Sequence, residues 1–262
     1  MAGERLPGVD PLIGGRRGTG AHPDVEVQVW WVLLQTQPAL LAGARALLSG
    51  DERRRADAFY FPHLRDEFTV ARATLRLLLS RLTGNPPGTI EFAYGPQGKP
   101  SLAGDGAAGV EFNVSHSGGI LGCAFTRHLA IGVDVEQHRP LADLAQIAQH
   151  FFSPAEVRDL MRVAEPARAA AFYDCWSRKE AFIKALGGGL SIPLDCFRVS
   201  LAPECAALLE VRDAPGEARA WTIQALRPAP GFSGALAIRH PSARVTVRHV
   251  GATDIFAAEG LG

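Results

Sequence analysis

Two acidic residues at the end of an apolar run are the features of this sequence most suited to chemistry. Asp134 and Glu136 belong to the segment Leu-Ala-Ile-Gly-Val-Asp-Val-Glu at residues 129–136. Side chains alternate along a β-strand, so Ile131, Val133 and Val135 enter a core while both carboxylates project from the opposite face. Like charges this close repel unless a proton or a cation lies between them, and oxygen ligands suit Mg²⁺ or Mn²⁺. The spacing therefore predicts a divalent-cation site.

A further acidic residue lies in a helix predicted over residues 166–186. Trp176, Glu180 and Lys184 occupy positions i, i+4 and i+8, so they form one stripe on this helix. Mg²⁺ takes one or two protein carboxylates and completes its octahedron with water and phosphate oxygens. An acidic pair with a lysine nearby therefore indicates a phosphate-bearing ligand. Taken alone, the Glu180–Lys184 spacing also fits a solvated ion pair.

The segment Phe-Asn-Val-Ser-His-Ser-Gly-Gly at residues 112–119 supplies another polar motif. It predicts a strand, a polar turn and a second strand, with both glycines in the turn. The hydroxyls and the imidazole of this turn suit hydrogen bonding to phosphate, and the alternative is that they only cap the turn. Ser115 and His116 do not suit a nucleophile and its base, because neighbouring strand residues point apart.

In their order and spacing, these motifs resemble those of the Sfp-type 4′-phosphopantetheinyl transferases. That family moves the phosphopantetheine arm of coenzyme A onto a serine of a carrier protein. Residues 112–118 resemble its Asn-x-Ser-His-Ser-Gly turn, residues 131–136 its Gly-(Ile/Val)-Asp-x-Glu strand, and residues 176–184 its Trp-x-x-Lys-Glu-(Ser/Ala)-x-x-Lys helix. Each motif is weak by itself, whereas their ordered combination is specific. The likeness extends over residues 49–200.

The resemblance implies an α+β fold built from two similar halves related by a pseudo-twofold, with coenzyme A bound in the cleft between them. We expect residues 24–118 to form the N-terminal half and residues 119–255 the C-terminal half, which carries the metal site. Residues 1–23 are rich in Gly, Pro and Arg, so we expect a disordered tail there.

The resemblance also implies roles for the acidic residues. Asp134, Glu136 and Glu180 match the metal-binding acids that hold Mg²⁺, or Mn²⁺, against the pyrophosphate of coenzyme A. Glu180 is expected to be the general base for the carrier serine, directly or through a metal-bound water, and 3′,5′-ADP is the leaving group. Lys184 is expected to bind phosphates or protonate the leaving group. The expected catalytic residues are therefore Glu180, Lys184 and Asp134.

A second set of residues is expected to bind coenzyme A. Arg72 is the first candidate for the 3′-phosphate, because planar guanidinium donors fit this group. The sequence follows the family only loosely between residues 51 and 76, so the choice among the arginines stays open. The full set comprises Arg55, Arg72, Arg76, Lys99, Pro100, Ser115, His116 and Lys184.

Two other functions remain open at this point. A metal-dependent hydrolase could use His116, Asp134, Glu136 and Glu180 as a site with one imidazole and three carboxylates. A non-catalytic module could bind coenzyme A or the carrier and would tolerate the loss of Glu180. Release of 3′,5′-ADP that depends on both coenzyme A and carrier separates the transferase from both.

Composition limits the partners. The chain has 262 residues with 27 basic and 27 acidic side chains, so its zero net charge does not suggest nucleic acid or a membrane surface. Its 4 cysteines form no Cys-x-x-Cys pair, and no run is long enough to cross a bilayer. We therefore expect a cytoplasmic monomer whose partners are coenzyme A and an acyl or peptidyl carrier protein. The sequence does not identify the carrier or its pathway, whether fatty-acid, polyketide or nonribosomal-peptide biosynthesis.

The remaining pattern predicts the elements that position these residues. Ser153 and Glu156 form a capping box at the start of a helix, which makes Glu156 structural, and glycines after residue 186 end the long helix. Further helices are predicted at residues 38–48 and 66–82. Strands are predicted at residues 25–34, 90–94, 112–114, 120–125, 129–135, 197–201, 208–211, 220–225 and 234–238.

Overall fold

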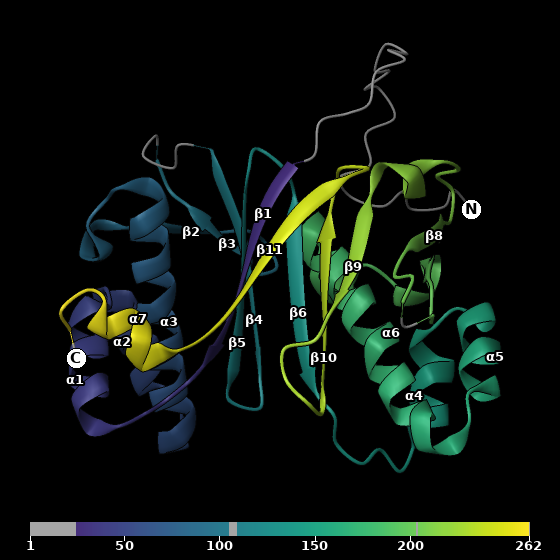
Figure 1. Ribbon diagram of the computed structural model, residues 1–262, viewed down its shortest axis with the longest axis horizontal. Coiled ribbons are helices and arrows are strands. Elements are labelled where there is room, and N and C mark those ends of the chain that lie inside the picture. The colour runs from purple at the N-terminus through teal and green to yellow at the C-terminus, as the bar shows by residue number, and fades with distance from the viewer. Residues whose placement is uncertain (1–24, 105–108, 203, 262) are drawn as a thin grey trace.

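The computed structural model describes residues 25–104, 109–202 and 204–261, and Figure 1 shows their arrangement. The expected disordered tail, residues 1–23, lies outside the described residues. The fold belongs to the α+β class, as predicted. Its helices are α1 (Pro38–Leu47), α2 (Gly50–Asp57), α3 (Pro62–Thr83), α4 (Leu144–Phe151), α5 (Pro154–Arg162), α6 (Glu165–Leu186) and α7 (Ala252–Ala257). Its strands are β1 (Val25–Leu33), β2 (Phe92–Tyr94), β3 (Pro100–Leu102), β4 (Val110–Ser117), β5 (Ile120–Arg127), β6 (Ile131–Gln137), β7 (Phe197–Val199), β8 (Leu208–Val211), β9 (Thr222–Leu226), β10 (Phe232–Ile238) and β11 (Ala243–Gly251).

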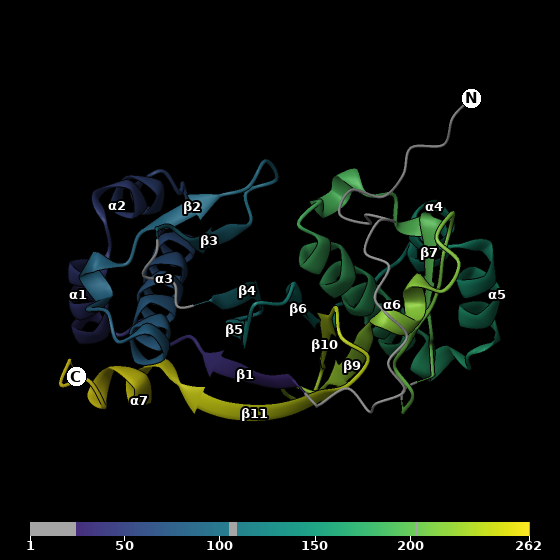
Figure 2. The same cartoon turned by 90° about the horizontal axis from the view of Figure 1, so that it is seen from above.

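Two sheets lie between two groups of helices, as Figures 1 and 2 show. One sheet has the strand order β11-β1-β5-β4 and the other β6-β10-β9. Apolar side chains from both sheets, among them Val29, Trp31, Val133 and Leu236, form one shared core. Helix α3 packs on the outer side of the first sheet and α6 on the outer side of the second. Because both faces of each sheet are covered, long stretches of β5 and β10 are buried.

Strand pairing changes the predicted division of the chain. β5 pairs antiparallel with β4 through the turn at Gly118 and Gly119, so a boundary between residues 118 and 119 would cut a hairpin. The sheet that contains β4 therefore extends to residue 127. Strand β11 then returns to the first sheet and pairs parallel with β1 along its whole length, and α7 packs on α3. The C-terminal segment thus belongs to the N-terminal half, and the pseudo-twofold relation of the halves stays a prediction.

The long helix α6 runs over almost the range that the sequence predicts, and its end has a clear cause. Gly187 follows it with φ 75°, a left-handed conformation that glycine adopts without strain, so the glycine run ends the helix as expected. Helix α3 ends in the same way at Gly84, but it begins four residues before the predicted start at residue 66. No helix in the described parts of the chain is long and apolar enough to span a membrane.

Candidate active site

The acidic residues of β6 face helix α6. Ile131, Val133 and Val135 are at most 1% exposed in the core between the sheets, which confirms the predicted alternation. On the opposite face, a Cβ atom at Gly132 would lie 2.0 Å from the main-chain oxygen of Ala181. Glycine therefore lets α6 approach this face of the strand, which no larger residue would allow. The approach brings the acids of the strand close to the polar stripe of the helix.

Asp134 and Lys184 form the centre of the site. Nζ of Lys184 lies 2.6 Å from Oδ1 of Asp134 and donates a hydrogen bond to Oγ of Ser115 at 2.9 Å. The Ser115 hydroxyl donates in turn to Oδ1 of Asp134 at 2.9 Å. Residues from β4, β6 and α6 thus meet at one point, although 69 residues separate Ser115 from Lys184 along the chain.

Two carboxyl groups near this centre, those of Glu136 and Glu180, have raised pKa values. Burial, together with the nearby charge of Asp134 and against the opposing charge of Lys184, raises the pKa of Glu136 to about 7. Burial also raises the pKa of Glu180, with Lys184 lowering it and Asp134 raising it. Glu136 and Glu180 therefore share an environment that disfavours their negative charge.

These acids fit a hard cation in donor type and charge. Oδ2 of Asp134 is buried and has no hydrogen-bond partner among the described residues, which leaves a carboxylate oxygen for a ligand. No group of three His, Cys, Asp or Glu within residues 25–104, 109–202 and 204–261 is close enough to hold a metal ion by itself. Mg²⁺ commonly takes only one or two protein carboxylates and fills its other positions with water or phosphate, so the donors present suit it.

The polar motif at residues 112–119 lies in a strand and not in a turn. β4 continues to Ser117, and the turn consists of Gly118 and Gly119, with φ 55° and 76°. The predicted polar turn is therefore wrong in its position, because the polar side chains make contacts across to β6 that keep this segment extended. Alternation directs Ser115 toward Asp134, whereas His116 is exposed and lines a cavity.

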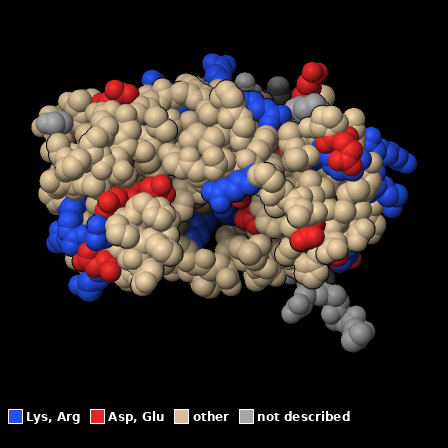
Figure 3. All heavy atoms as spheres, turned by 90° about the horizontal axis from the view of Figure 1, so that it is seen from below, with Lys and Arg blue, Asp and Glu red and all other residues tan. Residues whose placement is uncertain are grey.

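The cavity, with a volume of about 650 Å³, lies next to the acidic site. One wall comes from α2 and α3, with Arg55, Phe68 and Arg72, and the opposite wall from α6, with Glu180 and Lys184. The β2–β3 hairpin forms a third wall. Figure 3 shows a hollow in the molecular surface with basic side chains inside it. The lining thus joins the two halves of the chain around one space.

Arg72 has the geometry of an anion-binding residue. It is 8% exposed, lies over the rings of Phe68 and Phe92, and places Nε 3.6 Å from Oε1 of Glu52. Its buried Nη1 has no hydrogen-bond partner in the described part of the chain. Arg55 is exposed at the same cavity, with its guanidinium over the ring of Phe68. The structure therefore brings these two predicted arginines together.

Arg76 lies elsewhere. Its guanidinium is 1% exposed, binds Oε2 of Glu52 at 2.8 Å, and donates to the main-chain oxygens of Pro87 and Ile90. It does not belong to the described lining of the cavity beside α6. Its predicted role at the 3′-phosphate is therefore not supported, because a buried carboxylate and two carbonyls already use its donors.

Lys99 and Pro100 line the cavity, but the lysine binds the protein itself. Nζ of Lys99 donates to the main-chain oxygens of Ile131 (3.0 Å), Lys184 (2.7 Å) and Ala185 (3.4 Å). Burial lowers the pKa of this ammonium to about 8. The side chain thus links the β2–β3 hairpin to β6 and to the C-terminal end of α6, and its expected role in binding coenzyme A stays a prediction.

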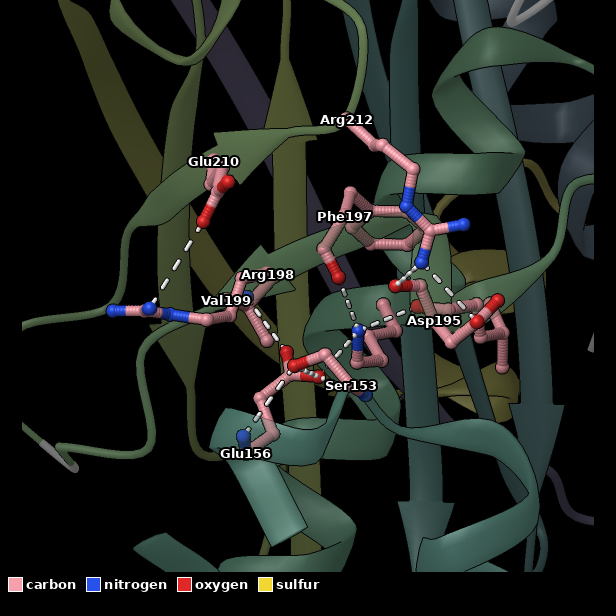
Figure 4. A network of polar contacts seen from close by, with 10 residues as sticks. Ser153, Glu156, Asp195, Phe197, Arg198, Val199, Glu210 and Arg212 are labelled. Atoms are coloured by element: carbon pink, nitrogen blue, oxygen red, sulfur yellow. Dashed lines mark hydrogen bonds and ion pairs between the residues drawn. The ribbon is translucent and has the colours of Figure 1, made fainter. Parts of the chain in front are cut away.

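A buried ion pair behind the site was missed in the sequence. Nζ of Lys179 lies 2.8 Å from Oε2 of Glu156 and donates to the carbonyls of Leu194 and Phe197. Figure 4 shows Glu156 of this network with Ser153, Phe197 and Val199 around it. The capping box of Ser153 and Glu156 is confirmed, and Oε1 of Glu156 also accepts from the main-chain N–H of Val199. The available signal was the position of Lys179 on the apolar side of the predicted helix. The pair fixes the rotation of α6 one residue before Glu180.

Comparison with known proteins gives a consistent result over both halves. Residues 130–238 match the family model described as the 4′-phosphopantetheinyl transferase superfamily. Residues 35–127 match the model described as 4′-phosphopantetheinyl transferase, N-terminal. The two models together cover the helices and strands described above except β1, β11 and α7.

Individual proteins agree with these models. The chain is 36% identical to the 4′-phosphopantetheinyl transferase HetI of Nostoc sp. over 81% of its own length and 87% of that protein. It is 31% identical to the 4′-phosphopantetheinyl transferase Sfp of Bacillus subtilis, over 75% and 84%. Among solved structures, the holo-[acyl-carrier-protein] synthase of Thermotoga maritima has 20% identity and a TM-score of 0.35, with 44% of this chain and 65% of that chain covered.

Proposed function

The chain belongs to the Sfp-type 4′-phosphopantetheinyl transferases, and we propose that its cavity beside α6 binds coenzyme A next to a divalent cation at the acids of β6. The enzyme transfers the 4′-phosphopantetheine group of coenzyme A to a serine of a carrier protein. The described residues support separate roles for individual side chains in this reaction.

One observation carries the proposed binding mode. A buried Arg72 nitrogen without a hydrogen-bond partner among the described residues belongs to the lining of one space of about 650 Å³, and a buried Asp134 oxygen in the same condition lies behind Lys184 of that lining, which binds the Asp134 carboxylate. The first suits a phosphate and the second suits a cation, and a ligand that carries both phosphates and a bound cation satisfies the two together. Coenzyme A, with its pyrophosphate and separate 3′-phosphate, meets this requirement. Exposed His116 is a further donor in the same cavity.

The proposed reaction uses Glu180 as the base. The carrier serine oxygen forms a bond to the phosphorus that bears the pantetheine arm, and the pyrophosphate P–O bond breaks to release 3′,5′-ADP. The serine proton passes to the carboxylate of Glu180, whose pKa is raised by burial and is therefore better matched to this transfer. The ammonium of Lys184 lies beside Asp134 and provides positive charge next to the reacting phosphate.

One or two of the carboxylates of Asp134, Glu136 and Glu180 would hold the Mg²⁺ or Mn²⁺ ion, with water and phosphate oxygens as its other ligands. A bound divalent cation supplies positive charge that stabilises the leaving pyrophosphate oxygen and lessens the repulsion among these acids. Within the chain itself, Lys184 orients Asp134, and Gly132 keeps α6 close enough to β6 for this contact, with Lys184 in the cavity lining.

The test is a reconstitution with purified components. Enzyme, coenzyme A, MgCl₂ and a purified apo carrier domain are mixed, and the carrier mass and free 3′,5′-ADP are both measured. We expect equal amounts of modified carrier and 3′,5′-ADP, with neither product when the carrier is omitted. Release of 3′,5′-ADP without carrier would indicate a hydrolase, and binding of coenzyme A without any product would indicate a non-catalytic module.

The preferred carrier, the oligomeric state and the cellular location are further proposals. A panel of acyl and peptidyl carrier domains in this assay identifies the preferred partner. A monomer is the simplest functional unit, because walls from both halves of one chain already enclose the cavity. A cytoplasmic location agrees with the 4 cysteines being free thiols, two of them buried.

A further inference from the structure

The edge of β6 is completed by side chains of β4. β6 is an outer strand of its sheet, and main-chain N–H groups on such an edge need other partners. Three side chains on one face of β4 accept hydrogen bonds from three alternate N–H groups of β6. The pairs are Asn113 Oδ1 with Val133 N (2.8 Å), Ser115 Oγ with Val135 N (3.4 Å) and Ser117 Oγ with Gln137 N (3.1 Å).

These pairs follow one register. Each acceptor binds the N–H group 20 residues later in the chain. Each serine also donates to the acidic residue 19 positions later: Ser115 to Asp134 at 2.9 Å, and Ser117 to Glu136 at 3.3 Å. One hydroxyl thus fixes both the backbone of β6 and the carboxylate beside it. We call Asn113, Ser115 and Ser117 the side-chain ladder.

The first residue of the ladder, Asn113, has no acidic partner on β6. The residue 19 positions later is Gly132, where the backbone of α6 lies close against β6. Asn113 is 3% exposed and holds the neighbouring Val133 amide. The ladder therefore sets the position of β6 at the same point where α6 packs against it.

The hydroxyl of Ser115 has no remaining capacity for a ligand. It donates once, to Asp134, and accepts twice, from Val135 N and from Lys184 Nζ. A hydroxyl has one donor and two acceptor sites, so these contacts use all of them. Of the central Ser-His-Ser residues, His116 is the one that is exposed at the cavity.

We propose that Asn113, Ser115 and Ser117 are positioning residues that hold the acids of β6 in register for the reaction. This inference rests on the proposed function. Groups that orient metal-binding residues commonly change metal affinity or activity by about 10–100-fold when removed. Ser117, with its single carboxylate contact, is the best position at which to test this role.

The experiment compares Ser117→Ala, Ser117→Thr and a control, Thr126→Val. Thr126 is also a buried strand hydroxyl, and it donates to the main-chain oxygen of Glu26, away from the acids. Amide hydrogen exchange at Gln137, Mg²⁺ affinity by calorimetry with coenzyme A present, coenzyme A affinity without metal, and turnover are measured for each variant.

We expect Ser117→Ala to speed exchange at Gln137 and to lower Mg²⁺ affinity and turnover by roughly tenfold, with metal-free coenzyme A affinity within about twofold of wild type. Ser117→Thr keeps the hydroxyl, so exchange, both affinities and turnover should stay close to wild type. Thr126→Val should leave Mg²⁺ affinity and turnover unchanged. If Ser117→Ala has the same turnover and Mg²⁺ affinity as Thr126→Val, the Ser117 hydroxyl has only a structural role, and the proposal is overturned. A matching fall in metal-free coenzyme A affinity would show that Ser117 contacts the ligand, and would overturn it too.

Failure of the proposed function has a different signature. A wild-type protein that modifies no carrier would refute that function, while exchange at Gln137 and the Mg²⁺ titration would still report on the ladder. His116→Ala completes the comparison, because it should weaken metal-free coenzyme A binding and leave exchange at Gln137 unchanged.

Discussion

Nζ of Lys99 lies 2.7 Å from the main-chain oxygen of Lys184, so a lysine from the β2–β3 hairpin caps the helix that presents Lys184 to the active site. A cation at a helix C-terminus compensates the partial negative charge of the last carbonyls. The same ammonium binds the carbonyl of Ile131 on β6. Three elements around the cavity are thereby held by one side chain.

Lys99→Met should change how stability depends on pH. The pKa of Lys99 is about 8 in the folded protein, against an ordinary value of 10.5. Between these pH values the unfolded chain keeps a proton that the folded chain has lost, so this group makes the free energy of unfolding rise with pH. Urea denaturation of wild type and Lys99→Met across this range should show that the contribution is absent from the variant. Parallel pH profiles for the two proteins would contradict the assigned pKa.

Glu136→Gln should stabilise the metal-free enzyme at and above neutral pH. The folded protein holds the Glu136 proton up to about pH 7, whereas the ordinary value is 4.5. Across that interval the folded state binds a proton that the unfolded state has released, so this group makes the free energy of unfolding fall as pH rises. Thermal denaturation in a chelating buffer should give a higher Tm for Glu136→Gln than for wild type. Exposed Glu204, replaced by Gln, is the control and should leave Tm unchanged.

Arg72 and Arg76 should behave differently although they lie one helical turn apart. Arg72→Ala should weaken coenzyme A binding by about 1.5–3 kcal/mol through the loss of a charge-assisted contact, with a smaller loss for dephospho-coenzyme A. Arg76→Met should instead lower the free energy of unfolding by about 3–5 kcal/mol, because it removes the closer of the two arginines that compensate the buried carboxylate of Glu52. Calorimetry with both ligands and urea denaturation separate the two effects. Equal losses for both ligands in Arg72→Ala would remove Arg72 from the 3′-phosphate.

The two lysines of α6 offer a second matched pair. Lys179 is 0% exposed and paired with Glu156, so Lys179→Met should cost about 3–5 kcal/mol of stability. The side chain of Lys184 is 27% exposed and faces the cavity, so Lys184→Met should cost less stability but abolish most of the turnover. Denaturation curves and steady-state rates below the unfolding temperature test both. A stable and fully active Lys179→Met protein would show that the buried pair does not fix α6.

Local pattern predicted the parts of this fold whose side chains alternate clearly. β6 was predicted because Ile131, Val133 and Val135 alternate with glycine and acidic residues. The end of α6 was predicted because a glycine run follows it. β11 gave no comparable signal, since it is a largely exposed outer strand whose stability comes from parallel pairing with β1. Contacts between distant segments of the chain produce that strand, and sequence periodicity does not report them.

The residues of the candidate site were also predictable only in part. Residue type and spacing identified Asp134, Glu180 and Lys184, because carboxylates and a lysine near a phosphate have an evident chemical purpose. The roles of Lys99 and Arg76 depended on which carbonyl or carboxylate lies nearby, and only the folded chain shows this. A basic residue that binds a ligand and one that binds the backbone are alike in sequence.

Glu180→Gln gives the most direct test of the proposed chemistry. The substitution keeps the size of the side chain and removes its basic oxygen, while Arg72, His116 and Lys184 remain available to the phosphates. Coenzyme A affinity should therefore stay within a few fold, and turnover at saturating Mg²⁺ should fall by roughly a hundredfold or more. Because burial raises the pKa of Glu180, the wild-type rate should also decline at acid pH as the carboxyl takes up a proton. Stopped-time assays of 3′,5′-ADP release over a pH series would record both effects. Near-normal turnover in Glu180→Gln would exclude this residue as the base and would leave its carboxylate only as a charged neighbour of Lys184.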